Sequence, residues 1–288
     1  MYSPAAARTV RKITVPELRD RKVAHGADAI AMVTAYDYTT ARIVDTAGVD
    51  MVLVGDSLGM VFQGLPDTLG VTLDDMVYHG RCVGRALRAA HLTIDMPFMS
   101  YQVSPQQALE SAGRLVKEGL AQSVKLEGGE RVAAAIDAIV GAGVPVVAHV
   151  GLTPQSVHAL GGFRVQGRGE EAAAQLIRDA VATQEAGAFA VVLEMVPGEL
   201  AAEVTAALHI PTIGIGAGVE CDGQVLVIND VLGLDDGPKP RFVKSYVDLK
   251  GVITGAVTTY LEEVRGGQFP DDAHSYHDRR LKAVKVSS

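Results

Sequence analysis

The chain has 288 residues, of which 48% are hydrophobic, and its 26 basic and 34 acidic side chains give a net charge of −8. These values predict a folded protein with a large core, and they argue against nucleic acid or an anionic membrane surface as its main partner. The two cysteines, Cys82 and Cys221, lie outside any CxxC pair, which argues against a zinc site or a disulfide framework. The apolar runs are too short to span a membrane, and the N-terminal "MYSPAAARTVRKIT" lacks the apolar core of a secretion signal. We therefore expect a cytoplasmic protein.

Short apolar runs alternate with longer amphipathic stretches along the chain, after a short helix pattern in "TVPELRDRKVAHG". The runs predicted to form strands are residues 29–34, 51–54, 92–94, 123–126, 145–148, 189–193, 211–215 and 225–228. They are apolar throughout instead of alternating with polar residues, which is typical of a parallel sheet covered on both faces.

The amphipathic stretches between these runs have the features of helices. Four of them are "TLDDMVYHGRCVGRALRAA" (72–90), "SPQQALESAGRLVKEG" (104–119), "GERVAAAIDAIVGAG" (129–143) and "EEAAAQLIRDAVATQEAG" (170–187). Several begin after Thr, Ser or Gly and end in Gly, as helices prefer. We therefore predict a single (β/α)₈ TIM barrel over residues 1–288, with an N-terminal helix and flexible tails at about 1–12 and 277–288. An open doubly wound sheet is the alternative, because "GAGVECDGQ" is too short for a full helix before the eighth strand.

Ionisable residues are sparse within the predicted strands, yet five consecutive strands end in one or carry one near the end. In chain order the polar residues are Asp56 and Ser57, then Asp95, then Lys125 and Glu127, then His149, then Glu194. The carboxyl ends of barrel strands are where active sites lie. This repetition favours a functional site at the strand ends over the alternative that Gly55-Asp56-Ser57 only forms a turn.

Several of these residues also have a structural interpretation. Asp95 could cap the turn before Met-Pro, and Lys125 and Glu127 could form a solvated ion pair at a strand end. His149 alone could be a hydrogen-bonded core histidine. The "GIGAG" segment is only a weak indication of a dinucleotide loop, because it lacks the GxGxxG spacing.

Taken together, the set has the residues needed for one kind of chemistry. Asp56, Asp95 and Glu127 offer oxygen ligands that suit a hard cation such as Mg²⁺, which polarises a carbonyl and stabilises an enolate. Lys125 can hold the same developing oxyanion or a carboxylate. Glu194 is a separate carboxylate that is free to act as a base. The residues predict proton abstraction next to the carbonyl of a 2-oxo acid.

The motifs "GDSLGM", "DMPFMSYQ", "VKLEGG", "VVAHVGLTPQ", "LEMVP" and "IPTIGIGAG" resemble those of the ketopantoate hydroxymethyltransferase family, over about residues 10 to 275. The resemblance implies a (β/α)₈ barrel enzyme of pantothenate synthesis. Such an enzyme transfers a hydroxymethyl group from 5,10-methylenetetrahydrofolate to 3-methyl-2-oxobutanoate, with Mg²⁺, and gives 2-dehydropantoate. It also implies a homo-oligomer, a decamer of two stacked pentameric rings.

The family's site residues can be carried over by position. The resemblance implies that Asp56 and Asp95 bind the metal ion, with Glu127 reaching it directly or through water. It places contacts to the 2-oxo acid on Asp56, Ser57, Asp95 and Lys125. All of these positions match in identity.

The resemblance further implies that Glu194 is the catalytic base and that His149 supports the site by hydrogen bonding. A lyase of the phosphoenolpyruvate mutase type remains an alternative, although such enzymes place a cysteine on an acid loop and Cys82 lies within a predicted helix. A metabolite-binding barrel without catalysis is a second alternative, and it leaves Glu194 unexplained. The apolar segment 247–256 could pack against neighbouring copies or only cover the barrel.

Overall fold

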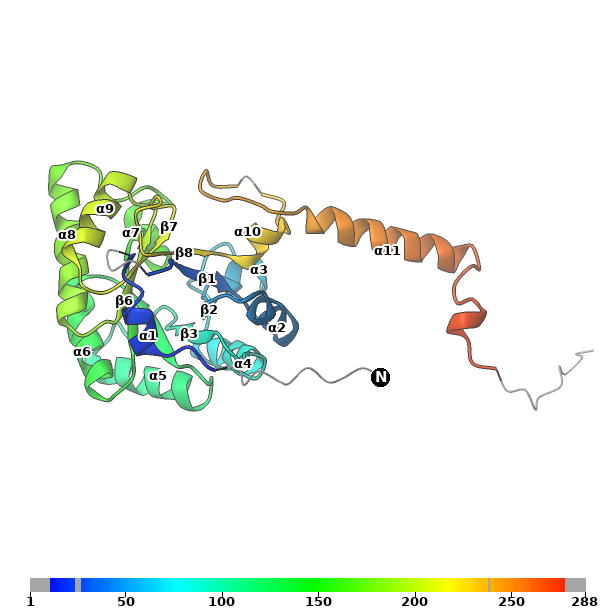
Figure 1. Cartoon of the computed structure of the whole chain (residues 1–288), viewed down its shortest axis with the longest axis horizontal. Coiled ribbons are helices and arrows are strands. Elements are labelled where there is room, and N and C mark those ends of the chain that lie inside the picture. Colours follow the sequence, from blue (N-terminus) through cyan, green and yellow to red (C-terminus); the bar gives the residue numbers. More distant parts are fainter. Residues whose placement is uncertain (1–10, 24–26, 238, 278–288) are drawn as a thin grey trace, which may run out of the picture.

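Eight parallel strands close into a barrel in chain order, and the last strand pairs with the first (Figure 1). The computed structural model describes residues 11–23, 27–237 and 239–277. The strands are β1 (Ile30–Thr34), β2 (Met51–Val54), β3 (His91–Asp95), β4 (Ser123–Glu127), β5 (Val146–Gly151), β6 (Ala190–Glu194), β7 (Thr212–Ile215) and β8 (Gly223–Leu226). The predicted (β/α)₈ barrel is therefore confirmed, and the open-sheet alternative is wrong.

The eighth strand begins two residues earlier than the predicted segment 225–228. Gly223 pairs with Ile30 of β1, and a Cβ atom at position 223 would lie 2.6 Å from the Ile30 carbonyl oxygen. Gly223, which the sequence predicts to lie in a loop, therefore pairs with β1 where the barrel closes. The chain leaves β8 directly into α10 (Ile228–Leu232).

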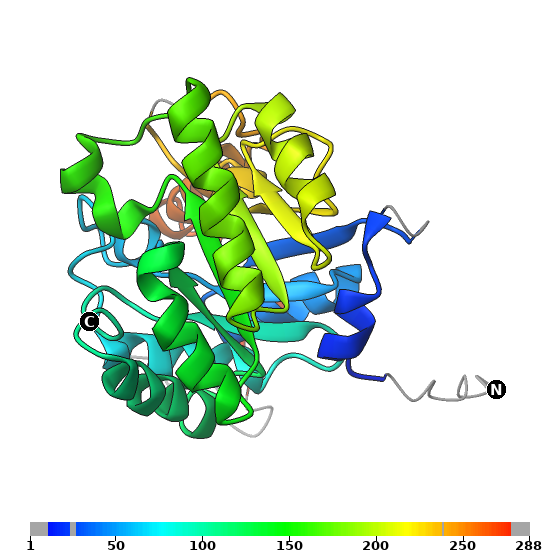
Figure 2. The same ribbon diagram turned by 90° about the vertical axis from the view of Figure 1, so that its left-hand side faces the viewer.

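Helices cover the outside of the strands (Figure 2). The longer ones are α2 (Tyr38–Ala47), α4 (Leu73–Gly84), α5 (Pro105–Lys117), α6 (Ala133–Gly141), α8 (Glu170–Glu185) and α9 (Gly198–Ala207). Short helices are α1 (Val15–Arg19), α3 (Leu58–Val61), α7 (Val157–Leu160) and the 3₁₀ turns η2 (Glu130–Val132), η3 (Pro154–Ser156) and η4 (Asp272–His274). As the sequence predicts, no helix separates β7 from β8.

Helix α4 ends at Gly84, which corrects the predicted helix 72–90. The start is as predicted, because Thr72 and Asp75 form a capping box. Beyond the helix, the Asp45 carboxylate accepts hydrogen bonds from the backbone N–H groups of Arg88, Ala89 and Ala90, at 2.8 to 3.0 Å. These three donors are therefore satisfied by a side chain of α2, and the chain turns into β3.

Apolar side chains fill the amino-terminal part of the barrel interior. Met32, Met51, Val147 and Ile213 belong to one buried cluster, and Leu18 of α1 is fully buried in the same cluster. The predicted N-terminal helix is therefore confirmed, and it closes the amino-terminal end of the barrel. The charged strand ends predicted from the sequence lie at the opposite, carboxyl-terminal end of the barrel.

Helix α11 (Leu249–Arg265) extends away from the barrel and contains no buried residue (Figure 1). The interpretation that segment 247–256 covers its own barrel is therefore wrong.

In the described part of the chain no helix is long and apolar enough to cross a membrane. The tails predicted at about 1–12 and 277–288 lie almost entirely outside the described residues, and the single-domain expectation stays a prediction.

Candidate active site

The register of the sheet brings the polar strand ends together. Asp95 pairs with Lys125, Glu127 pairs with His149, and Gly151 pairs with Glu194. In neighbouring parallel strands, paired residues lie side by side, and residues two apart on one strand share a face. Lys125, Glu127 and His149 are buried, so these charged side chains gather inside the barrel mouth.

Asp56, Asp95 and Lys125 form one half of the site. The Lys125 Nζ atom lies 2.7 Å from Asp95 Oδ1, and Asp95 Oδ2 accepts a hydrogen bond of 3.1 Å from the Asp56 backbone N–H. All three side chains are buried. The turn after β2 therefore places the Asp56 carboxyl group beside the Asp95–Lys125 pair.

Glu194 and His149 form the other half. His149 Nε2 lies 3.2 Å from Glu194 Oε2, while His149 Nδ1 lies 3.5 Å from Glu127 Oε1 and 3.2 Å from Lys125 Nζ. Glu194 keeps 15% of its side-chain surface exposed, whereas the side chain of His149 is 3% exposed. Glu194 is thus the carboxylate of this group that an incoming molecule can reach.

The backbone beside Glu194 is strained. Met195 has φ of +46°, a left-handed conformation that is costly for a residue with a side chain. It is held by two hydrogen bonds, from the Met195 N–H to the Ile215 carbonyl and from the Gln166 N–H to the Met195 carbonyl, both 2.9 Å. Gly151, at φ of +94°, leaves no room for a Cβ atom against the Glu194 carbonyl. Strain of this kind is common where a functional side chain has to be aimed.

Ser57 lies at the start of α3, and its hydroxyl is 2.9 Å from the Tyr36 hydroxyl. Tyr36 is buried, and its carbonyl oxygen accepts a 2.6 Å hydrogen bond from His79 Nδ1. The Ser57 hydroxyl is therefore oriented by Tyr36, which was not among the predicted site residues.

Gln155 and Tyr101 are the site residues that sequence reasoning missed. Gln155 donates from Nε2 to Asp56 Oδ2 (2.8 Å) and from its backbone N–H to Glu127 Oε2 (3.0 Å). The Tyr101 hydroxyl donates to Gln155 Oε1 (2.7 Å) and accepts from the Glu127 N–H (3.1 Å). Both lie within motifs that carry the resemblance, but neither has a charge that would have drawn attention to it.

Burial and mutual repulsion dominate the electrostatics. Burial, together with the carboxylates of Asp95 and Glu127, raises the pKa of Asp56 well above its usual range. Burial also raises the pKa of Asp95, although Lys125 acts in the opposite direction. Burial and Lys125 act to lower the pKa of His149, but the two neighbouring glutamates outweigh them and raise it to about 9. The site thus holds more negative charge than its own cations compensate.

The donors present fit a hard cation such as Mg²⁺. Glu127 Oε1 is buried and forms no hydrogen bond with any described residue, since His149 Nδ1 lies 3.5 Å away, so this oxygen can still bind a cation or a ligand. In residues 11–23, 27–237 and 239–277, no three His, Cys, Asp or Glu side chains form a complete metal-binding group. Mg²⁺ is commonly held by one or two carboxylates and otherwise by water and substrate, so this incomplete set is compatible with it.

A profile of the ketopantoate hydroxymethyltransferase family matches residues 12–272 of the chain. The chain belongs to this family. A protein of Pelobacter propionicus named 3-methyl-2-oxobutanoate hydroxymethyltransferase is 54% identical, over 93% of this chain and 98% of its own length. A protein of Syntrophotalea carbinolica with the same name is 58% identical, over 86% of this chain and 93% of its own. The resemblance seen in the motifs is therefore confirmed over the whole barrel.

The barrel also resembles solved structures of other enzymes. One is phosphoenolpyruvate phosphomutase from Streptomyces platensis subsp. rosaceus, with a TM-score of 0.60, 15% sequence identity and 88% coverage of each chain. At this identity the likeness extends to the fold alone. Ketopantoate hydroxymethyltransferases and this mutase thus share a barrel architecture.

The Tyr101 hydroxyl offers a test of the polar network. In Tyr101→Phe, the buried Glu127 N–H and Gln155 Oε1 each lose a partner, and we expect the free energy of unfolding in urea to fall by about 1–3 kcal/mol. Tyr78→Phe is the control, because the Tyr78 side chain is largely exposed and should change stability by less than about 0.5 kcal/mol. Equal stability of the two variants would contradict a structural role for the Tyr101 hydroxyl.

Proposed function

We propose that this chain transfers a hydroxymethyl group from 5,10-methylenetetrahydrofolate to 3-methyl-2-oxobutanoate. Together with one water molecule, these substrates give 2-dehydropantoate and tetrahydrofolate. Family membership supports the reaction, and one structural observation supports its mechanism. Glu194, the accessible carboxylate, faces His149 Nε2, whereas Lys125 pairs with Asp95 and reaches only the other imidazole nitrogen, so proton removal and oxyanion stabilisation have separate residues.

Glu194 is the proposed base that removes the proton from C3 of the oxo acid. Its Oε2 atom faces His149 Nε2 at 3.2 Å, whereas Oε1 has no hydrogen bond from any described residue. An ionised carboxylate held through one oxygen keeps the other available for the proton. His149 therefore acts as a positioning residue, held in turn between Lys125 and Glu127.

We propose that Asp56 and Asp95 hold Mg²⁺, with Glu127 reaching it directly or through water. Bound there, Mg²⁺ would polarise the 2-oxo group and make the C3 hydrogen more acidic. The Lys125 ammonium, at 2.7 Å from Asp95, lies where it can attract the developing negative charge of the oxo acid. Together with Asp56 and Asp95, the Ser57 hydroxyl and Lys125 supply the contacts that orient this substrate.

The carbon–carbon bond then forms between C3 of the oxo acid and the methylene carbon of the folate. The C3 electron pair makes the new bond, both carbon–nitrogen bonds of the methylene carbon break, and water supplies the hydroxyl group. The proton removed from C3 and the second proton of the water go to the two folate nitrogens. A lyase of the phosphoenolpyruvate mutase type has no comparable support. The single described cysteine that sequence reasoning considered for it, Cys82, lies within α4 on the outer helical layer.

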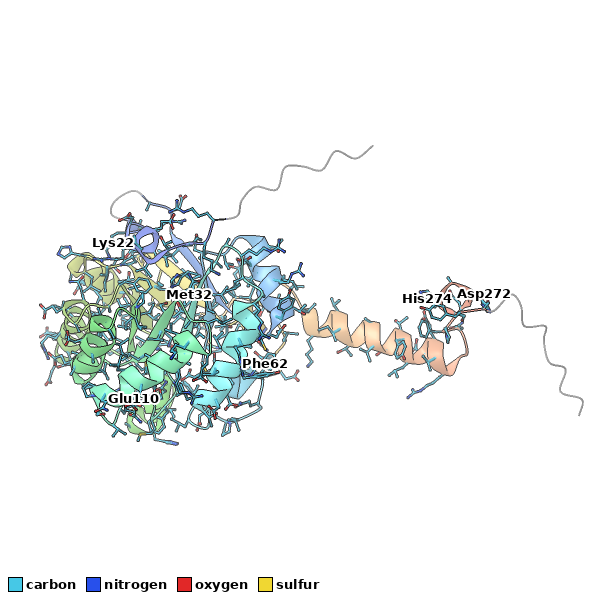
Figure 3. The ribbon with its side chains drawn as sticks, turned by 90° about the horizontal axis from the view of Figure 1, so that it is seen from below. Lys22, Met32, Phe62, Glu110, Asp272 and His274 are labelled. Carbon is cyan, nitrogen blue, oxygen red and sulfur yellow. The ribbon has the colours of Figure 1, made fainter. Side chains whose placement is uncertain are left out.

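We further propose that the chain assembles into a decamer through contacts that include α11. Exposed apolar side chains recur on this helix at helical spacing, namely Ile253, Val257, Tyr260, Leu261 and Val264. Figure 3 shows the helix and the residues Asp272 and His274 beyond it projecting from the barrel, with their side chains away from its surface. A 17-residue helix is only marginally stable in water without a partner for its apolar stripe.

The first test concerns the metal ion. Asp56→Asn and Asp95→Asn each remove a charged oxygen ligand, and we expect the affinity for Mg²⁺ in the presence of 3-methyl-2-oxobutanoate to fall at least about tenfold. The measurement is isothermal titration calorimetry, with Asp137→Asn on the exposed face of α6 as the control. Unchanged Mg²⁺ affinity in both site variants would refute the assignment.

The second test concerns the base. Without folate, the wild type with Mg²⁺ should exchange the C3 hydrogen of 3-methyl-2-oxobutanoate with solvent deuterium, which NMR detects. Glu194→Gln keeps the shape but cannot accept the proton, so we expect exchange to slow by about a hundredfold or more. Glu199→Gln, at the start of α9, should exchange normally.

Two outcomes would contradict the role of Glu194. Near-normal exchange in Glu194→Gln would transfer the base role to another group, with His149 the next candidate. Loss of oxo acid binding together with exchange would mean that Glu194 organises the site instead.

The third test concerns assembly. Light scattering should find a decamer for the wild type at micromolar concentration. The double variant Ile253→Asp, Val257→Asp should give smaller species with an unchanged barrel, because α11 buries nothing within its own chain. Thr258→Asp lies off the apolar stripe and should leave the assembly intact. A monomeric wild type would refute the proposal.

A further inference from the structure

A cavity of about 390 Å³ borders the candidate active site. It lies between the segment after β3, the start of α6 and the η3 turn, and its inner wall includes Glu127 and Gln155. Glu127 contacts His149, and Gln155 contacts Asp56. The volume is within the range of small-molecule sites, and the cavity touches the catalytic network directly.

The remaining walls are mainly apolar and aromatic, with one cation. Phe98 and Tyr101 contribute rings, and Val132 and Ala135 contribute aliphatic surface. The Arg131 guanidinium donates from Nη2 to Ser156 Oγ (3.0 Å) and forms no ion pair with any described carboxylate. Such a cavity suits an aromatic ring that carries a carboxylate, because arginine binds carboxylates through paired hydrogen bonds.

A second cavity, of about 480 Å³, shares Arg131 with the first but is less suited to an anion. Two carboxylates line it, those of Glu130 and Asp179. Glu130 accepts a hydrogen bond from Gln175 Nε2, and Asp179 accepts one from the Glu130 N–H. These neutral donors leave both negative charges in place, so an anionic group would be repelled there.

We propose that the first cavity binds the p-aminobenzoylglutamate part of the folate co-substrate. In this arrangement, the benzoyl ring lies against Phe98 and Tyr101, and a glutamate carboxylate binds the Arg131 guanidinium. The pteridine end, which carries the methylene carbon, then extends past Glu127 and Gln155 toward the barrel mouth. The inference rests on the proposed function, because that function supplies the folate.

The experiment compares two co-substrates, 5,10-methylenetetrahydrofolate and 5,10-methylenetetrahydropteroate, which lacks the glutamate. In Arg131→Gln, we expect the KM for the folate to rise about tenfold or more, the effect of losing a charge-assisted hydrogen bond. The KM for the pteroate should equal that of the wild type. Folate-independent exchange at C3 should also be unchanged, since that step does not involve Arg131. Arg178→Gln, on α8, is the control for loss of a nearby arginine and should alter neither KM.

A second variant tests the ring site without a change in charge. Ala134→Trp, on the exposed face of α6, should fill the cavity and raise the KM for both co-substrates, while exchange at C3 continues. Asp137→Trp on the same helix does not border the cavity and should behave as the wild type. Thermal melting checks that each variant is folded.

The outcomes separate this inference from the proposed function. A wild type that forms no product with either co-substrate would overturn both. An active wild type whose KM for the folate is unaffected by Arg131→Gln, or whose KM rises equally for folate and pteroate, would overturn the carboxylate contact. An unaffected Ala134→Trp variant would overturn the choice of cavity.

Discussion

Buried negative charge is the constraint on which the rest of this site depends. Four carboxyl groups, those of Asp56, Asp95, Glu127 and Glu194, gather in the barrel mouth around two cationic side chains, Lys125 and His149. Burial makes such an excess unfavourable, and the raised pKa of Asp56 expresses that cost. A divalent cation and an anionic oxo acid, bound together, would relieve it. Charge balance in a low-dielectric mouth thus supports the proposal that a metal ion binds there.

The fold keeps this arrangement in place at both ends. At the amino-terminal end, apolar strand side chains and the buried Leu18 of α1 pack into one cluster that fills the barrel. At the mouth, Gln155 links Asp56 to Glu127, and the backbone around Met195 is fixed by ladder and loop hydrogen bonds. Hydrogen-bond donors from neighbouring loops therefore fix the positions of the acidic side chains. Pre-organisation of this kind lowers the cost of assembling the site when substrates bind.

The strands, and the gathering of their charged ends at one edge of the barrel, could be predicted from the sequence because they obey simple patterns. Apolar runs ending in a charge indicate buried strands that point at a shared edge, and the observed register then pairs Asp95 with Lys125 and Glu127 with His149. The features that escaped prediction depend on contacts distant in sequence. Gln155 acquires its role from partners 28 and 99 residues away, and the end of α4 depends on the Asp45 carboxylate. The start of β8 at Gly223 was not predicted. Glycine is needed there because the Ile30 backbone comes too close for a Cβ atom, and no local sequence pattern reveals that contact.

In the proposed reaction, the barrel mouth joins a folate-borne carbon to the activated C3 of an oxo acid. The most direct measurement supplies 5,10-methylenetetrahydrofolate with ¹³C in the methylene group, together with Mg²⁺ and 3-methyl-2-oxobutanoate. We expect ¹³C NMR to find the label in the hydroxymethyl carbon of 2-dehydropantoate, and we expect product formation to stop when the Mg²⁺ is chelated. Product without the label, or no product with all components present, would show that the barrel mouth does not catalyse this transfer.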